Sequence, residues 1–198
     1  PVNIFDEKAF KQVVEEQGES KATAAKADMI AHATKKAISE RLEQDPAFFE
    51  KFSKMIQQAI DDFRAKRISD LDYLNKVTEI KEAVVNRRTD DAPAQLGGND
   101  NALALYGVLK PYVLGHVSTE DVAANLAADS AIDIWSIIQR NRKVGFWDDL
   151  DAQRRTMNEI DDYLYDEVKG NKGVQLTTGE MDDIIDRTMQ LARHRMVG

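Results

Sequence analysis

Apolar residues recur with a period close to 3.6 along almost the whole chain, and this pattern constrains the fold more than any other feature. The clearest stripe has spacings of three and four residues and consists of Phe49, Phe52, Ile56, Ile60 and Phe63. Such spacing places the side chains on one face of an α-helix. Almost no stretch alternates with period two, as a half-buried strand would. We therefore predict an all-α fold, an irregular multi-helix bundle of about eight helices.

Capping residues indicate where several of these helices begin. Asp45 can cap the helix that carries the phenylalanine stripe, with Pro46 at its first position. Capping-box pairs indicate two further starts, at Ser69 with Asp72 and at Thr177 with Glu180. The other expected helices cover about 5–17, 20–44 and 101–114, one that Ser118 caps, and one that runs from Asp148 or Asp149 to Gly170.

The same period predicts which residues face the core. Alanine dominates the helix over 20–44, so we expect it to pack closely against a neighbour. Further predicted inner positions are Met55, Leu71, Leu74, Val77, Val122, Leu126, Ile134, Ile138, Leu150, Met157 and Ile160.

One break interrupts the helical pattern more strongly than the others. Between Thr89 and Asn101 the chain contains an Asp-Asp pair, a proline and the Gly97-Gly98 pair within a polar run. We predict an N-terminal helical subdomain over 1–90, a linker or hinge over 91–100, and a C-terminal helical subdomain over 101–198. Each subdomain would contain about four helices.

Composition excludes several classes of site. The 198 residues include no cysteine, which removes disulfides and thiolate metal sites and fits a reducing compartment. No apolar run approaches the roughly 20 residues that cross a bilayer, so we expect a cytoplasmic protein without membrane contact. The net charge of −8 disfavours DNA binding across a whole face. The chain starts at Pro1 rather than at a methionine, so we expect a piece of a longer protein.

The most specific catalytic pattern is Glu79-Ile80-Lys81, which follows Asp70 and Asp72. Metal-dependent nucleases use an acidic residue and an E-x-K element to hold Mg²⁺ and activate water. That chemistry needs adjacent strands, whereas this segment has the helical period. Residues two apart on a helix lie about 200° around its axis, so Glu79 and Lys81 point to different sides. A solvated helix face is the better interpretation.

Other patterns also lack the spacing that chemistry requires. The five Asp-Asp pairs do not follow the calcium-loop pattern, and no phosphate-binding loop occurs. His32, His116 and His194 fall in distant segments and form no zinc motif. We therefore predict no catalytic, cofactor-binding or metal-binding residue in this segment. An enzyme with a site assembled from dispersed carboxylates is a weaker hypothesis.

Aromatic and basic residues gather in one segment near the middle of the C-terminal half. Trp135, Phe146 and Trp147 flank the basic stretch Arg140 to Lys143. They could be core aromatics at a helix–turn–helix corner, or they could anchor a partner, since Trp and Arg are favoured at interface hot spots. The basic clusters could stabilise helix ends, or they could contact DNA phosphates or an acidic protein face.

Several stretches together resemble the helical region that follows the motor domains in the R subunit of type I restriction-modification enzymes. At the N-terminal end they are Ile4-Phe5-Asp6 with Phe10, Phe52-Ser53-Lys54-Met55-Ile56 and the helix Leu74 to Val85. The others are Ala102 to Tyr106 and the block from Ile134 to Asp166, which includes Ile160-Asp161-Asp162-Tyr163-Leu164. The family commonly has an Asp-Trp pair in this last block, where the present chain has Phe146-Trp147.

The resemblance implies a function in assembly. Such a region would dock the R subunit, an ATP- and Mg²⁺-dependent DNA translocase and endonuclease, onto the modification subunit of the methyltransferase core. It would also contact the motor domains of its own chain, and it would carry no catalysis itself. Candidate partner-binding residues are Trp135, Arg140, Arg142, Trp147, Tyr163 and Tyr165. The alternative function is a helical module that contacts duplex DNA and guides it to the motors.

Overall fold

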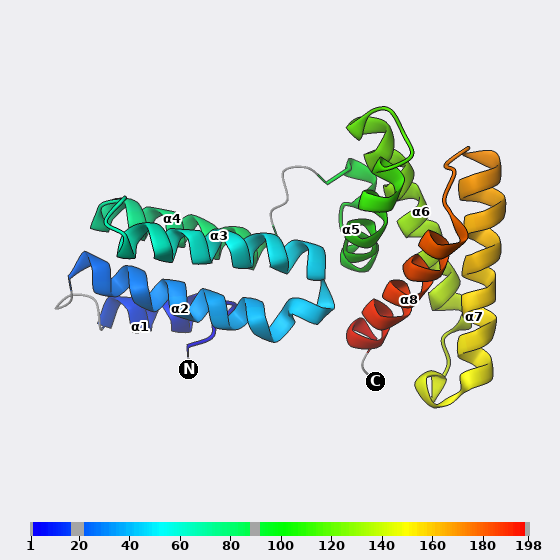
Figure 1. Ribbon diagram of the computed structural model, residues 1–198. Helices are drawn as coiled ribbons and strands as arrows, with labels where there is room; N and C mark the ends of the chain where they lie inside the picture. Colours follow the sequence, from blue (N-terminus) through cyan, green and yellow to red (C-terminus); the bar gives the residue numbers. More distant parts are fainter. Residues whose placement is uncertain (1, 17–21, 88–91, 197–198) are drawn as a thin grey trace. The chain divides into compact units, whose positions relative to one another are not determined.

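The computed structural model describes residues 2–16, 22–87 and 92–196, and its regular structure there is helical (Figure 1). These residues form eight α-helices and no strand, so the predicted all-α fold is confirmed. The helices are α1 (Glu7–Glu16), α2 (Thr23–Arg41), α3 (Pro46–Arg64), α4 (Asp70–Asn86), α5 (Asp100–Leu114), α6 (Glu120–Asn141), α7 (Leu150–Tyr163) and α8 (Thr178–Arg195). Shorter helical segments are η1 (Leu42–Gln44), η2 (Ala94–Leu96), η3 (Phe146–Asp148) and the π-helix η4 (Leu164–Asn171).

The chain divides into two compact units. The first unit comprises residues 1–42 and 48–90, and the second comprises 43–47 and 91–198. Each unit contains its own cluster of buried apolar residues. Residue 91 of the predicted linker lies outside the described residues. Further along that segment, Leu96 is buried in the core of the second unit and Asn99 caps α5, with its side chain accepting from the Ala102 N–H at 3.0 Å.

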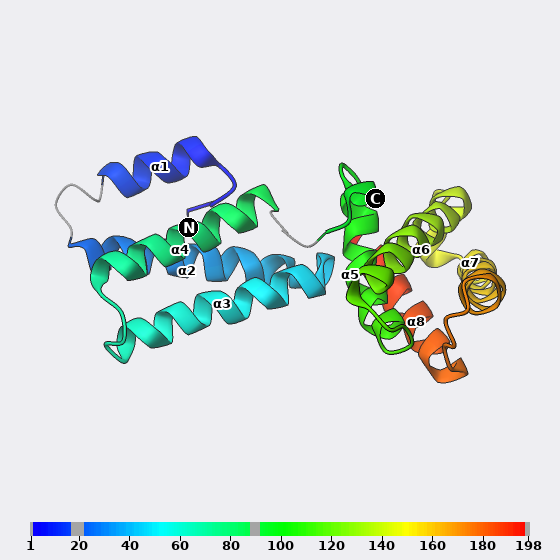
Figure 2. The same ribbon diagram turned by 90° about the horizontal axis from the view of Figure 1, so that it is seen from above.

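The first unit is built around α2, α3 and α4 (Figure 2). Helix α2 packs closely against α4, because Ala27 and Ala31 are fully buried and let the two backbones approach. The phenylalanine stripe of α3 fills the space between the helices, with Phe49, Phe52 and Ile56 almost completely buried. Burying a side chain of this size stabilises the fold by roughly 1.5–3 kcal/mol.

Two predicted inner positions of the first unit are wrong. Met55 is 42% exposed and Leu71 is 61% exposed. Met55 borders the stripe that packs inward, and Leu71 lies in the first turn of α4. The start of α4 is as predicted: Ser69 and Asp72 form a full capping box.

The second unit is built around the pair α5 and α6, which α7 and α8 cover. Alanines at 123, 127, 128 and 131 are fully buried on α6 and allow α5 to lie close to it. The predicted inner residues Ile134 and Ile138 are buried, but Val122 is 44% exposed. Helix α5 packs against the alanine face of α6, which includes Ala123. Val122 lies beside this face and is therefore exposed. The cap of α6 is Thr119 rather than the predicted Ser118, with the Thr119 Oγ1 accepting from the Val122 N–H at 3.3 Å.

Helix α7 begins at Leu150 after Asp149, one of the two predicted caps, whose carboxylate accepts from the Ala152 N–H at 2.9 Å. Leu150 itself is 64% exposed, so its predicted place on the inner face is wrong. It is the first residue of the helix and lies outside the buried stripe, which consists of Ala152, Thr156 and Ile160. The helical path continues as η4 to Asn171, and the Thr177–Glu180 capping box begins α8 as predicted.

Candidate protein-docking surface

The candidate surface is the α6–α7 corner, residues 140–150, where α6 ends and the chain turns into α7. Gly145 has a φ of 74°, in the left-handed region that favours glycine, and permits the sharp turn. The next residue, Phe146, is 3% exposed and fixes η3 to the core of the second unit. The corner is therefore an ordered part of the fold.

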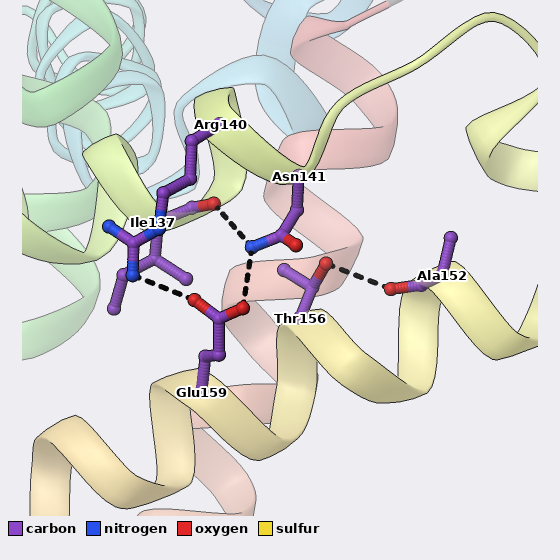
Figure 3. Close-up of polar contacts among 6 residues, drawn as sticks. All are labelled: Ile137, Arg140, Asn141, Ala152, Thr156 and Glu159. Carbon is purple, nitrogen blue, oxygen red and sulfur yellow. Dashed lines mark hydrogen bonds and ion pairs between the residues drawn. The ribbon is translucent and has the colours of Figure 1, made fainter.

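A single carboxylate joins the two helices at this corner. Figure 3 shows Glu159 of α7 between Arg140 and Asn141 of α6. The Arg140 Nη2 donates to Glu159 Oε2 at 2.7 Å, and the Asn141 Nδ2 donates to Glu159 Oε1 at 3.2 Å. The same Asn141 amide group donates to the Ile137 carbonyl at 3.0 Å. Both oxygens of Glu159 thus hold the end of α6 against α7.

A second set of contacts closes the turn. The Lys143 ammonium lies 2.5 Å from the Asp149 carboxylate, and this contact, followed by the Ala152 N–H, lowers the pKa of Asp149 to about 2. The Gln153 Nε2 donates to the carbonyls of Phe146 at 3.1 Å and Trp147 at 3.0 Å. These contacts brace the backbone between α6 and α7.

The two tryptophans occupy different environments. Trp135 is 3% exposed and belongs to the core of the second unit, which favours the core interpretation and removes it from the accessible surface. Trp147 is half-buried, its indole N–H donates to the Met196 carbonyl at 3.4 Å, and its ring meets Phe146 edge-on. The Arg193 guanidinium lies 6.0 Å from the centre of the Trp147 ring. Trp147 therefore supports the corner with one side and reaches solvent with the other.

The two predicted tyrosines lie at the other end of α7. The Tyr163 hydroxyl donates to Asp133 Oδ2 at 2.7 Å, and burial, reinforced by this carboxylate, raises the Tyr163 pKa. Tyr165, on η4, is 59% exposed, and the Lys169 ammonium lies 5.4 Å from the centre of its ring. Tyr163 joins α6 to α7, whereas Tyr165 is available to a partner.

Among the predicted residues, the structure brings together Arg140, Arg142 and Trp147 at the corner. It adds Val144, which is fully exposed next to the exposed Arg142. Sequence reasoning missed Glu159 and Gln153, which brace the corner, because no local pattern links them to residues across the turn. An isolated valine within a basic, glycine-containing turn was the only available signal for Val144.

The residues of the nuclease-like pattern, which the sequence already disfavours as a site, do not gather around one point. The Lys81 ammonium lies 5.0 Å from the Phe10 ring, and Asp72 accepts from the Ser69 hydroxyl at 2.7 Å in the cap of α4. The described residues contain no cluster of three or more His, Asp or Glu side chains that could hold a metal ion. The chemistry that the corner can perform is recognition through a cation and an aliphatic side chain.

Comparison with known proteins finds no family model, no curated protein and no solved structure that matches the chain. Among the described residues, no helix has both the length and the apolar character needed to cross a membrane.

Proposed function

We propose that the chain is a helical assembly domain that docks a larger subunit onto a protein partner and performs no catalysis itself. The observation that carries the proposal is the α6–α7 corner, which is braced from both helices yet leaves Arg142 and Val144 exposed. A preorganised turn loses little conformational entropy on binding, and arginine is enriched among the residues that contribute most to protein interfaces.

The resemblance of the sequence to the C-terminal region of type I restriction R subunits supports one partner. We propose that the corner meets the modification subunit, that ATP and Mg²⁺ serve the motor and nuclease domains of the same chain, and that the protein acts in the cytoplasm. Trp147 would lie at the margin of the contact, whereas Tyr165, at the other end of α7, would lie outside it. Trp135 is excluded from it, because it is buried.

Calorimetric titration of the chain into the purified modification subunit tests the proposal. We expect binding by the wild type and an affinity about tenfold lower for Val144→Asp and for Arg142→Glu, since a central hot-spot residue contributes more than 1 kcal/mol. Val122→Asp and Lys54→Glu are matched controls, because they introduce the same residues at exposed positions elsewhere. Absence of wild-type binding would contradict the proposed partner, and equal affinities for all variants would contradict the proposed surface.

The second candidate is contact with duplex DNA, which the basic stretch Arg140 to Lys143 favours. The overall charge of the second unit disfavours DNA binding, because residues 91–198 contain 18 Asp and Glu against 11 Lys and Arg, a net charge of −7. Duplex binding at ~20 mM salt, where phosphate contacts are strongest, that is lost in Arg142→Glu would support this candidate over the first.

A further inference from the structure

The outer face of α7 carries a charge pattern that is symmetric about one residue. Arg154, Arg155, Asn158, Asp161 and Asp162 are all exposed and recur at helical spacing. Two cations precede Asn158 by four and three residues, and two carboxylates follow it by three and four. Figures 1 and 2 both show α7 at the edge of the second unit, with the other helices of that unit on one side only. The pattern therefore lies on a face that no other helix of this unit covers.

These charges cannot neutralise one another within one copy of the chain. Arg154 and Asp161 are seven residues apart, which is about 10 Å along the helix axis. The only ion pair that the described residues make on this face joins Arg154 to Asp151 at 3.6 Å, and both side chains are strongly exposed. Such a pair contributes little, so the face remains electrostatically unmatched.

We propose that this face binds a second copy of the chain, with the two α7 helices antiparallel about a two-fold axis at Asn158. In that arrangement Arg154 faces the partner's Asp161, and Arg155 faces the partner's Asp162, because the two-fold axis keeps each residue on its own flank of the contact. The two-fold axis repeats both pairs, so four cations meet four carboxylates. A parallel arrangement would place arginine against arginine and aspartate against aspartate, and this repulsion selects the antiparallel orientation.

Exposed apolar residues lie at both ends of the pattern at matching positions. Leu150 is eight residues before Asn158 and 64% exposed, and Tyr165 is seven residues after it and 59% exposed. Antiparallel α7 helices bring Leu150 of one copy to Tyr165 of the other, at each end of the contact. The contact would cover both of these exposed side chains.

The contact is small and mainly polar, so we expect a weak dimer that salt dissociates. Sedimentation equilibrium of the 198-residue chain measures this. At roughly 0.5 mM protein we expect dimer at ~20 mM salt and monomer at ~500 mM, because exposed charge pairs are screened at high ionic strength. A wild-type chain that is monomeric at the low salt concentration would overturn the proposal.

Charge-reversed variants test the pairing itself. Arg154→Glu with Arg155→Glu removes both arginines from the face and makes it acidic, and Asp161→Lys with Asp162→Lys makes it predominantly basic, with Asp151 as its remaining carboxylate. We expect each double variant to be monomeric alone and an equimolar mixture of the two to form a heterodimer. Circular dichroism verifies that each variant is helical. Self-association that either double variant retains, or a mixture that stays monomeric, would overturn the proposal.

A cysteine trap tests the position of the two-fold axis and does not depend on the charged variants. The chain contains no cysteine, so Asn158→Cys introduces a single thiol. If the axis passes through position 158, the two Cα atoms approach within the ~7 Å that a disulfide requires. We expect oxidation to form covalent dimer about tenfold faster than in Ser136→Cys, an exposed control position on α6, because pairing raises the effective thiol concentration. Equal rates would place the contact elsewhere.

Discussion

At the scale of single residues, the environment of a side chain decided its role more than its identity did. Trp135 and Trp147 are equally plausible anchors in the sequence, yet one is buried in a core and the other supports a corner. Glu159 carries no distinguishing local pattern, but its two oxygens hold α6 against α7. Asp149 combines a cap with an ion pair, and both roles favour its charged form.

The lowered pKa of Asp149 predicts a specific dependence of stability on pH. A carboxyl whose pKa is lower in the folded state stabilises the fold above its unfolded value of about 4, and this stabilisation is lost as the pH falls toward 2. Asn at this position keeps the cap but not the charge. We expect Asp149→Asn to be less stable than the wild type at pH 6, by a difference that shrinks as the pH falls through about 2. Chemical denaturation across this range measures the difference; a difference independent of pH would contradict the assignment.

At the scale of elements, small residues set the distance between neighbouring helices. Alanines line the contacts of α2 with α4 and of α5 with α6, and these are the most closely packed pairs of their units. The large residues fill the wider spaces, as the phenylalanine stripe of α3 does. The π-helix η4 follows α7, and its residues Leu164 and Val168 are both buried. The helical period alone does not distinguish it from α-helix.

A larger residue at a close helix contact should therefore be costly. Ala127 on α6 is fully buried, and Ala127→Leu would force α5 and α6 apart. We expect a loss of about 1–3 kcal/mol in the free energy of unfolding. Val122→Leu on the same helix is the control, because Val122 is 44% exposed and should tolerate the change within about 0.5 kcal/mol. Urea denaturation measures both variants, and a tolerated Ala127→Leu would show that the contact is looser than described.

At the scale of the whole molecule, the chain forms two units with separate cores. Trp135 and Trp147 are its only tryptophans, and both lie in the second unit. Tryptophan fluorescence therefore reports on the second unit alone, whereas circular dichroism at helical wavelengths reports on both units. The two signals can separate the stabilities of the units.

Core truncations should act on one unit at a time. Ile138 and Ile56 are both fully buried, in the second and first units respectively. We expect Ile138→Ala to lower the stability reported by fluorescence by roughly 2–5 kcal/mol. Ile56→Ala should leave the fluorescence transition unchanged and shift only part of the circular dichroism transition. If both variants shift both signals equally, the units unfold as one cooperative structure.

The sequence by itself determined the helical class of the fold and several helix starts. The period of apolar residues and the capping pairs at Ser69 and Thr177 are local, so they need no knowledge of neighbouring helices. The burial of a residue at the centre of an apolar stripe also follows from the local sequence, as it does for Ile56 and Ile138.

Only the tertiary structure decided which residues at the edges of the stripes are buried and which side chains meet across the α6–α7 corner. Met55, Leu71, Val122 and Leu150 were predicted to face inward and are exposed. The burial of an edge position depends on where the adjacent helix crosses, and that crossing is set by the side chains of both helices. Contacts such as Arg140 with Glu159 join residues 19 apart in sequence and arise from the turn, so no local pattern could reveal them.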